Sequence, residues 1–508
     1  MSGQAEPHPE SVSRSDVARG AGLAGLSRLS VGIEAIAQPL YIWLFGLASY
    51  GIYVVLWGAV NLLSNLLDLC LTSGLQRVVP LQRDEERANA AVKLALIVSM
   101  STTTAAAALI ALNAEWIAGF FATAPQDREA LPRMIAIFVW TLPLWTFVEI
   151  ATSAARARRA FGPEIRLRLF WEQVARILFA LGVFALGMRS TGLIVAHLAS
   201  LSITALLSVR LLTRYYDPRL LVRARIERDL ARNLLISGVG LLPSELARRA
   251  LVDAPAILLN LMIPGARGAD AAGLFEIGRK LATVPQIVRQ AFQYVLGPLS
   301  SHQASVDRSV IGLLYRFSSR VSTALVVPLA GLMIFSARDL LSVYREEAMG
   351  ALPILVILSA ARAADAIVGP STAIVEMVGH RALPMLNTLI AMLVWVVLAL
   401  MLVPQHGALG MAIAVAAAVL ATSWAAMVEL RISDGVSPFD LKLLQGLAVA
   451  MVGLAAMAGA EWLLGGPARF AAVVALWLVT TWFTLRYGLS REDRRGLGGL
   501  SKALRLPV

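Results

Sequence analysis

Charged residues are scarce in this chain of 508 residues, because Asp, Glu, Lys and Arg make up 15% of it whereas 58% is hydrophobic. A soluble protein has about a quarter charged residues, so this chain has too few polar groups to cover a water-facing surface. The mean hydropathy of +0.70 excludes a disordered or fibrous chain as well. An all-α polytopic membrane protein remains, and spans of about 20 residues each predict about 14 transmembrane helices.

Residues for metal and nucleophile chemistry are also few. Cys70 is the single cysteine, which excludes a disulfide framework and a CxxC metal site, and the five histidines are scattered. The sequence contains no P-loop and no GxSxG motif. We therefore expect that the protein is not an enzyme and that it has no catalytic residues, no metal site and no cofactor. A coupling ion, H+ or Na+, is left open.

Long apolar segments alternate with short polar connections, and no connection is long enough for a separate domain. Such segments are typical of helices embedded in lipid. We expect transmembrane helices at residues 20–47, 50–74, 91–112, 133–153, 169–188, 192–212, 233–262, 269–298, 312–335, 351–376, 384–404, 407–429, 442–464 and 467–487.

Arginine predicts the orientation, because cytoplasmic loops of membrane proteins are enriched in basic residues. One side of the predicted bundle collects most of the arginines, including Arg210, Arg214, Arg219, Arg223, Arg225, Arg228 and Arg232 around the connection 213–232. Together with the tails 1–19 and 488–508, this connection is predicted to be cytoplasmic. We expect a multi-pass protein of the bacterial inner (plasma) membrane, with both termini in the cytoplasm.

An internal repeat divides the chain into two lobes. Tyr50-Gly51-Ile52-Tyr53 and Ala272-Gly273-Leu274-Phe275 open two spans that lie 222 residues apart, and Arg159-Ala160-Phe161 matches Arg381-Ala382-Leu383 at the same offset. We predict an N-lobe at 20–212 and a C-lobe at 233–429, each of six helices in the same orientation, with two extra helices within 430–487. Such parallel repeats are typical of transporters.

Ionisable residues occur inside several predicted spans, where each costs about 2.5–3.5 kcal/mol on insertion scales. In span 233–262, Glu245, Arg249 and Asp253 are spaced by four residues and so share one helical face. Pro243 and Pro255 interrupt the same span. These five residues are candidates for a gate, and the alternative is an ion-pair ladder that only holds the lobes together.

A second group is cationic. Arg28, Arg279 and Lys280 are expected to be incompletely neutralised and, with Arg249, to bind an anionic substrate, since arginine matches phosphate oxygens. Glu172 with Arg176, and Arg362 with Asp365, are spaced as structural ion pairs. Asp68 and Glu149 are candidates for ion coupling, although single acids near an interface are more often merely solvated.

Several motifs together resemble the polysaccharide flippase branch of the multidrug/oligosaccharidyl-lipid/polysaccharide exporter superfamily. The resemblance covers about residues 15–430 and depends on the order and spacing of these motifs. The motifs are Ala48-Ser49-Tyr50-Gly51-Ile52-Tyr53, Gly74-Leu75-Gln76-Arg77, Ala271-Ala272-Gly273-Leu274-Phe275 with Arg279, Leu296-Gly297-Pro298-Leu299-Ser300, and Gly407-Ala408-Leu409-Gly410-Met411-Ala412.

The resemblance implies a transporter that flips an undecaprenyl-diphosphate-linked oligosaccharide to the outer leaflet by alternating access, for O-antigen lipopolysaccharide or exopolysaccharide biosynthesis. Its partners would be this lipid-linked oligosaccharide, membrane lipids and polysaccharide polymerase or assembly proteins, with no nucleic acid. The main alternative is an ion-coupled drug/cation antiporter of the same fold, which requires an acid-rich cavity. A membrane glycosyltransferase or polymerase is less consistent with the short loops. A scaffold role is less consistent with the charged residues inside the spans.

Overall fold

The computed structural model describes residues 30–82, 84–158, 160, 167, 170–287, 308–378, 383–497, 501 and 505. All regular elements within these residues are helical. The main helices are α2 (Ser30–Phe45), α3 (Leu47–Leu67), α4 (Leu71–Val78), α5 (Glu85–Leu112), α6 (Ala114–Ala118), α7 (Leu131–Phe138), α8 (Thr141–Ala157), α10 (Glu172–Ala185), α11 (Gly192–Tyr215), α12 (Pro218–Arg223), α13 (Arg228–Val239), α14 (Leu242–Met262), α15 (Ala266–Leu281), α17 (Arg308–Phe335), α18 (Ala337–Leu341), α19 (Leu352–Ile367), α20 (Ser371–Val378), α21 (Leu383–Ser433), α22 (Leu441–Leu463), α23 (Gly466–Gly488) and α24 (Arg491–Gly496).

The expected all-α membrane fold is confirmed. Among the described residues, nine helical segments are long and apolar enough to cross a membrane. The helix count of fourteen stays a prediction, because α2, α10 and α15 are short and α14 is rich in charge. One of the nine segments, α21, holds two antiparallel helices. Gly407 adopts φ 56° there, and the Asn387 side chain donates to Glu429 Oε2 at 2.8 Å, so the chain reverses direction.

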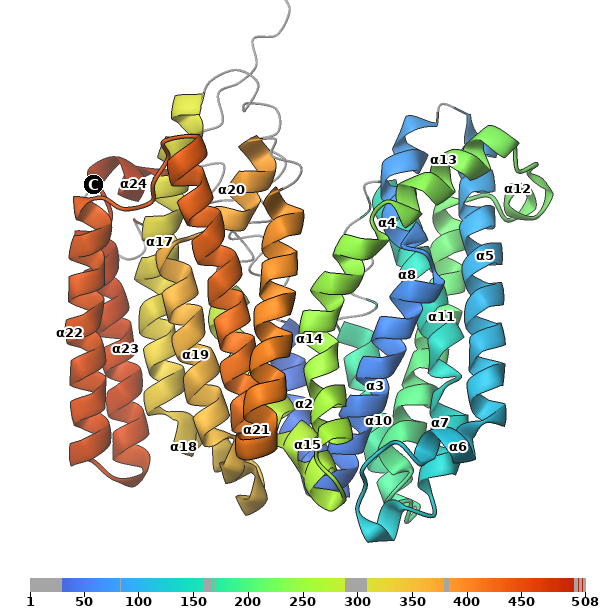
Figure 1. Ribbon diagram of the computed structural model, residues 1–508, viewed down its shortest axis with the longest axis horizontal. Helices are drawn as coiled ribbons and strands as arrows, with labels where there is room; N and C mark the ends of the chain where they lie inside the picture. The colour runs from blue at the N-terminus through green and yellow to red at the C-terminus, as the bar shows by residue number, and fades with distance from the viewer. Residues whose placement is uncertain are drawn as a thin grey trace, which may run out of the picture.

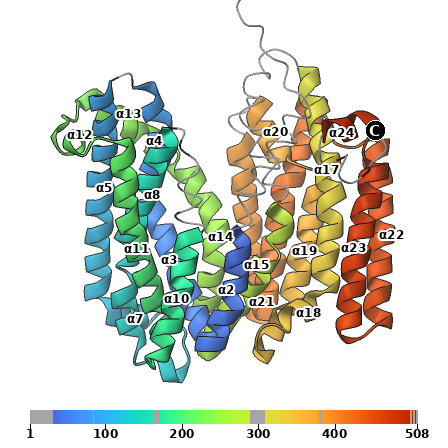
Figure 2. The same cartoon turned by 180° about the vertical axis from the view of Figure 1, so that it is seen from behind.

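Two helical bundles stand side by side (Figure 1). One contains α3 to α13 and the other contains α17 to α24, while α14, α15 and α2 lie between them. The bundles converge at the end that carries α6, α7 and α18 and lean apart at the end that carries α12, α13 and α24. From behind, α2 lies between the bundles (Figure 2), and it contacts α3, α10 and α15.

The converging end is tied by hydrogen bonds between distant parts of the chain. Tyr344 Oη donates to Gln38 Oε1 at 3.0 Å, Trp43 Nε1 donates to the Val343 carbonyl at 2.9 Å, and Arg345 donates to the Trp43 carbonyl at 2.7 Å. Asn260 of α14 pairs with the backbone of Ala122 through two hydrogen bonds of 2.7 and 3.0 Å. These contacts fix the two bundles to each other at this end.

The repeat glycines meet where α3 crosses α15. A Cβ placed on Gly51 would lie 1.9 Å from the Ala269 carbonyl oxygen, and one placed on Gly273 would lie 3.5 Å from the Gly51 Cα. Close approach of two helix backbones requires small residues at the crossing. Two glycines that the sequence repeat aligns therefore contact each other at this crossing.

The basic connection packs on the first bundle. Lys93 of α5 donates to the carbonyls of Val222 and Ala224 at 2.7 and 3.0 Å, and Arg87 pairs with Glu227 at 3.0 Å. The predicted span 233–262 is not one helix, because the chain turns after Val239 and α14 begins at Leu242. The second half of that span alone reaches the centre of the molecule.

Candidate functional site

The charged helices α14 and α15 meet α3, α8 and α10 around two adjoining cavities. The first cavity has a volume of about 350 Å³ and is lined by Trp57, Asn61, Trp145, Glu172, Gln173, Arg176, Arg248, Arg249, Val252 and Asp253. The second has a volume of about 150 Å³ and is lined by Tyr50, Tyr53, Val54, Trp57, Gly58, Asn61, Val252, Asp253, Ala256, Glu276, Arg279 and Lys280. Because four lining residues are shared, the two cavities form one polar region.

Cations outnumber acids on the lining of this region. Five lining side chains are cationic, namely Arg176, Arg248, Arg249, Arg279 and Lys280, and three are acidic, namely Glu172, Asp253 and Glu276. The structure thus brings together three of the four predicted substrate-binding cations: Arg249, Arg279 and Lys280. Arg28 lies outside the described residues.

Arg279 is more fully neutralised than the sequence suggests. Its Nε and Nη2 donate to the two carboxylate oxygens of Glu276 at 2.8 and 2.7 Å, one turn earlier on α15. Lys280 Nζ lies 3.7 Å from the same carboxylate. One acid is therefore shared by two cations, and this arrangement holds both cationic groups at the second cavity.

Arg362 of α19 adds a further cation near Arg279, close enough to feel its charge. The pairing of Arg362 with Asp365 stays a prediction. Asp365 is buried on α19, and i, i+3 spacing brings two side chains near each other without fixing their rotamers.

The predicted ladder on α14 is rearranged. Glu245 pairs with Arg248 on its own helix, whereas Arg249 reaches across to Glu149 of α8 at 3.3 Å. Asp253 lies near Asn61 of α3 and feels the charges of Arg249 and Arg279. The ion pair that leaves α14 therefore connects it to α8, and the charges do not form a ladder along one face.

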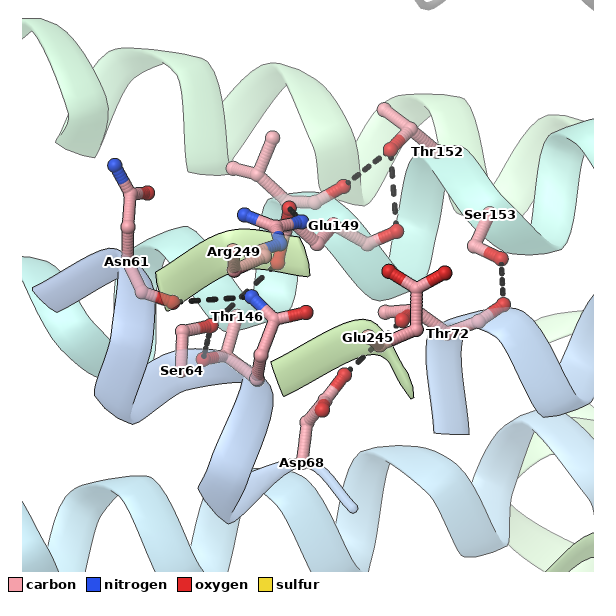
Figure 3. Close-up of polar contacts among 12 residues, drawn as sticks. Asn61, Ser64, Asp68, Thr72, Thr146, Glu149, Thr152, Ser153, Glu245 and Arg249 are labelled. Atoms are coloured by element: carbon pink, nitrogen blue, oxygen red, sulfur yellow. Dashed lines mark hydrogen bonds and ion pairs between the residues drawn. The ribbon is translucent and has the colours of Figure 1, made fainter. Parts of the chain in front are cut away.

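Glu149 lies in a polar network between α3, α4, α8 and α14 (Figure 3). It is 7% exposed, and Ser64 Oγ, which also contacts Thr146 at 3.0 Å, donates to its second oxygen at 3.5 Å. The charge of Glu149 also acts on the fully buried Asp68. This network places the buried Glu149 carboxylate next to Arg249.

Asp68 stabilises the turn between α3 and α4. Leu69 and Cys70 adopt φ values of 53° and 54°, a region that non-glycine residues rarely occupy. The Asp68 carboxylate accepts hydrogen bonds from Cys70 N at 2.8 Å and Thr72 Oγ1 at 3.1 Å. Both carboxylate oxygens of Asp68 thus hold this strained turn in place.

The two prolines of the predicted gate occupy different positions. Pro243 lies in the first turn of α14, where a missing backbone N–H costs nothing. Pro255 lies inside α14, where it removes a hydrogen bond of the helix. The sequence predicted that both prolines interrupt one span. Instead, Pro243 starts α14, and Pro255 alone interrupts its hydrogen bonds.

Sequence reasoning missed the aromatic and amide part of the site. Trp57 and Asn61 of α3, Trp145 of α8 and Gln173 of α10 line the first cavity. The buried pair of Glu172 and Arg176 forms as expected, and it also lines this cavity. The available signal was Asn61, a polar residue in a mostly apolar stretch, one turn after Trp57.

The chain is similar to the lipid II flippase MurJ in an inward closed conformation, with a TM-score of 0.70 and 11% identity over 92% of this chain and 98% of that one. It is also similar to an inward-facing multidrug resistance MATE family transporter, with a TM-score of 0.60 and 14% identity over 89% and 96% of the two chains. A transporter from Pyrococcus furiosus gives the same score and identity over 89% and 99%.

These likenesses define the class: the fold is that of the MOP superfamily of transporters and flippases. The sequence profile of the family described as "Polysaccharide biosynthesis protein" matches residues 44–345, and the chain belongs to this family. Relatives of this kind are transporters or flippases rather than enzymes, which agrees with the expectation from the sequence. No curated protein matches the sequence.

Proposed function

We propose that this protein flips a lipid-diphosphate-linked oligosaccharide from the cytoplasmic to the outer leaflet of the bacterial inner membrane, for surface polysaccharide synthesis. The observation that carries the proposal is the cationic lining of two adjoining cavities inside a bundle of membrane-spanning helices. Charged side chains are costly at that depth unless they face a polar cavity or a ligand. Binding of an anionic headgroup would explain why charged side chains occur at this depth.

The chemistry of the lining suits a diphosphate. Arg279 and Lys280 share Glu276, so an incoming phosphate group can take over donors that this one carboxylate now accepts. Arginine binds phosphate oxygens through paired N–H groups. The polyprenyl tail would stay in the surrounding lipid while the polar headgroup crosses in the cavity.

Alternating access fits the arrangement of the bundles. They are tied together at one end and lean apart at the other (Figure 1). With the predicted orientation, the diverging end faces the cytoplasm, where the substrate is made. Rocking of the bundles about the α3–α15 crossing would then move the headgroup to the outer side, where polymerase or assembly proteins would receive it.

A matched set of variants tests the proposal. We expect Arg279→Ala to abolish surface polysaccharide output while the protein is still inserted, and the double variant Arg28→Ala with Lys280→Ala to lower it. Arg486→Ala is the control, because this arginine lies on the outer helix α23 against Trp482 and Tyr487. Unchanged output with Arg28, Arg279 and Lys280 all neutralised would falsify the cationic-site proposal. Export of cationic drugs instead would support the antiporter alternative.

We also propose that Glu149, rather than Asp68, is the coupling group. Asp68 uses both carboxylate oxygens to hold the α3–α4 turn, whereas Glu149 is bound to a cation on a different helix and beside the cavity. Binding of a coupling ion at Glu149 would release Arg249 from this pair. We expect Glu149→Gln to remove the dependence of transport on the ion gradient at normal protein levels, and Asp68→Asn to lower the amount of folded protein. A Glu149→Gln variant with the wild-type dependence on the gradient would contradict this assignment.

A further inference from the structure

The two cavities differ in their chemistry. The second is lined by Glu276, Arg279 and Lys280, whereas the first contains two indole rings and two amides beside its ion pairs. The ring centroids of Trp57 and Trp145 are 5.0 Å apart at an interplanar angle of 75°. Indole rings next to side-chain amides suit a ligand that has both apolar C–H faces and hydroxyl groups.

Charges in the first cavity are already matched. Arg176 pairs with Glu172, Arg248 pairs with Glu245, and Arg249 pairs with Glu149. Each guanidinium on this cavity therefore has a carboxylate of its own, in contrast to the shared Glu276 of the second cavity. A neutral polar group is better suited to the first cavity than a second anion.

A buried acceptor without a hydrogen-bond partner belongs to Gln173, a residue that lines the first cavity. Gln173 Oε1 is buried, and it has no hydrogen-bond partner among the residues that the structure describes. Gln173 lines the first cavity together with Asn61. Leaving a buried carbonyl oxygen without a donor is costly, so this atom indicates a ligand that supplies an O–H or N–H group.

We propose that the first cavity is a sugar subsite that binds the neutral, hydroxyl-bearing sugar attached to the diphosphate, with Trp57 against its C–H face and Gln173 accepting from a hydroxyl. This inference rests on the proposed function, because it assumes that Arg279 and Lys280 hold the diphosphate. A sugar bonded directly to the diphosphate must lie in a directly adjoining space. The two cavities meet that requirement, since Trp57, Asn61, Val252 and Asp253 line both.

The volume of the first cavity is consistent with this ligand. At about 350 Å³ it lies within the range of about 300–1,000 Å³ that is typical of small-molecule sites. It has room for one or two sugar rings rather than for a long oligosaccharide. The subsite would therefore recognise the sugars next to the diphosphate, and the rest of the repeat unit would extend beyond it.

The test compares two lipids on the purified full-length protein in detergent micelles. One is undecaprenyl diphosphate without sugar, and the other is the lipid-linked oligosaccharide pool extracted from cells that make the polysaccharide. For the wild type we expect the sugar-bearing lipid to bind about tenfold more tightly, a difference of about 1.4 kcal/mol. Gln173→Leu should reduce this difference at least severalfold and leave the affinity for undecaprenyl diphosphate unchanged, because Gln173 lines the first cavity and not the second. Trp57→Ala should also reduce the difference at least severalfold, and it should weaken both lipids because Trp57 lines both cavities.

Two controls separate the outcomes. Trp462→Ala removes an indole that is 86% exposed at the end of α22, and it should bind both lipids as the wild type does. Arg279→Ala should weaken both lipids equally. Equal affinity of the wild type for the two lipids, or an undiminished preference in both Trp57→Ala and Gln173→Leu, would overturn the sugar subsite. Binding of neither lipid to the wild type would overturn the proposed function itself.

Discussion

Two helical hairpins of this protein differ in the number and position of their ionisable residues. The α14–α15 hairpin carries nine ionisable residues, several of them in mid-helix, whereas the longer α22–α23 hairpin carries four. Those four are Lys442, Glu461, Arg469 and Arg486, and each lies within four residues of a helix end. Charge at the ends of a span reaches the interface, but charge in the middle needs a polar interior.

The two hairpins also differ in what surrounds them. Large apolar side chains such as Val452 and Val479 are exposed on α22 and α23, as expected for a surface in contact with lipid. The α14–α15 hairpin instead faces α3 and the cavities. We infer that the position of a helix in the assembly, rather than its mean hydropathy, determines whether it tolerates charge.

A charge on the outer hairpin should have the largest effect. Val452 is 71% exposed near the middle of α22, so Val452→Arg should cost about 2.5–3.5 kcal/mol on insertion and lower the amount of inserted protein strongly. Leu441→Arg, at the helix end, is the control and should be tolerated because its side chain can reach the interface. Quantitative membrane fractionation measures both. Normal insertion of Val452→Arg would mean that this face does not contact lipid.

Adding a methyl group where α3 crosses α15 should have the next largest effect. A Cβ on Gly51 would lie 1.9 Å from a backbone oxygen of α15, so Gly51→Ala must push α3 and α15 apart, at a cost of about 1–3 kcal/mol. The melting temperature of the purified protein should fall. Gly459→Ala on α22 meets no atom within 4 Å and serves as the control. Equal melting temperatures for the two variants would argue against the crossing.

Removing the proline inside α14 should change the transport rate more than stability. Pro255→Ala restores a helix hydrogen bond, and we expect a rate reduced severalfold with an unchanged melting temperature, because the helix bends less readily. Pro243→Ala in the first turn should behave as the wild type. The rate of polysaccharide appearance at the surface distinguishes them, and identical rates would count against a hinge at Pro255.

The smallest effect concerns Asp440, which precedes α22 and lies outside the spans. Its burial works to raise its pKa, but hydrogen bonds from Arg320 and Leu443 N and the charges of Arg320 and Arg316 outweigh this and hold the pKa below its ordinary value. The ionised form is therefore stabilised in the folded protein, and this contribution is lost as the pH falls through the lowered pKa. Asp440→Asn should flatten the acid side of the melting temperature measured against pH, and an unchanged acid side would contradict this role of Asp440.

The sequence predicted the helical membrane fold well, because long apolar segments have few other folded forms. It also found the charged helices, since Arg249, Arg279 and Lys280 stand out against apolar neighbours. It did not predict which acid neutralises which cation: Glu149 lies 100 residues before Arg249, and only tertiary packing brings them to 3.3 Å. Gln173 and Trp145 were missed because a single amide or indole in a span has many structural explanations.

We infer that the cavities form a water-filled, electropositive chamber inside the membrane-spanning bundle. Asn61→Cys in a Cys70→Ser background tests it most directly, because Asn61 lines both cavities. We predict that the cysteine reacts with small charged methanethiosulfonates, and faster with the sulfonate reagent than with the trimethylammonium reagent, whereas Val452→Cys reacts with neither. A cysteine at position 61 that stays unreactive, or that prefers the cationic reagent, would contradict the account.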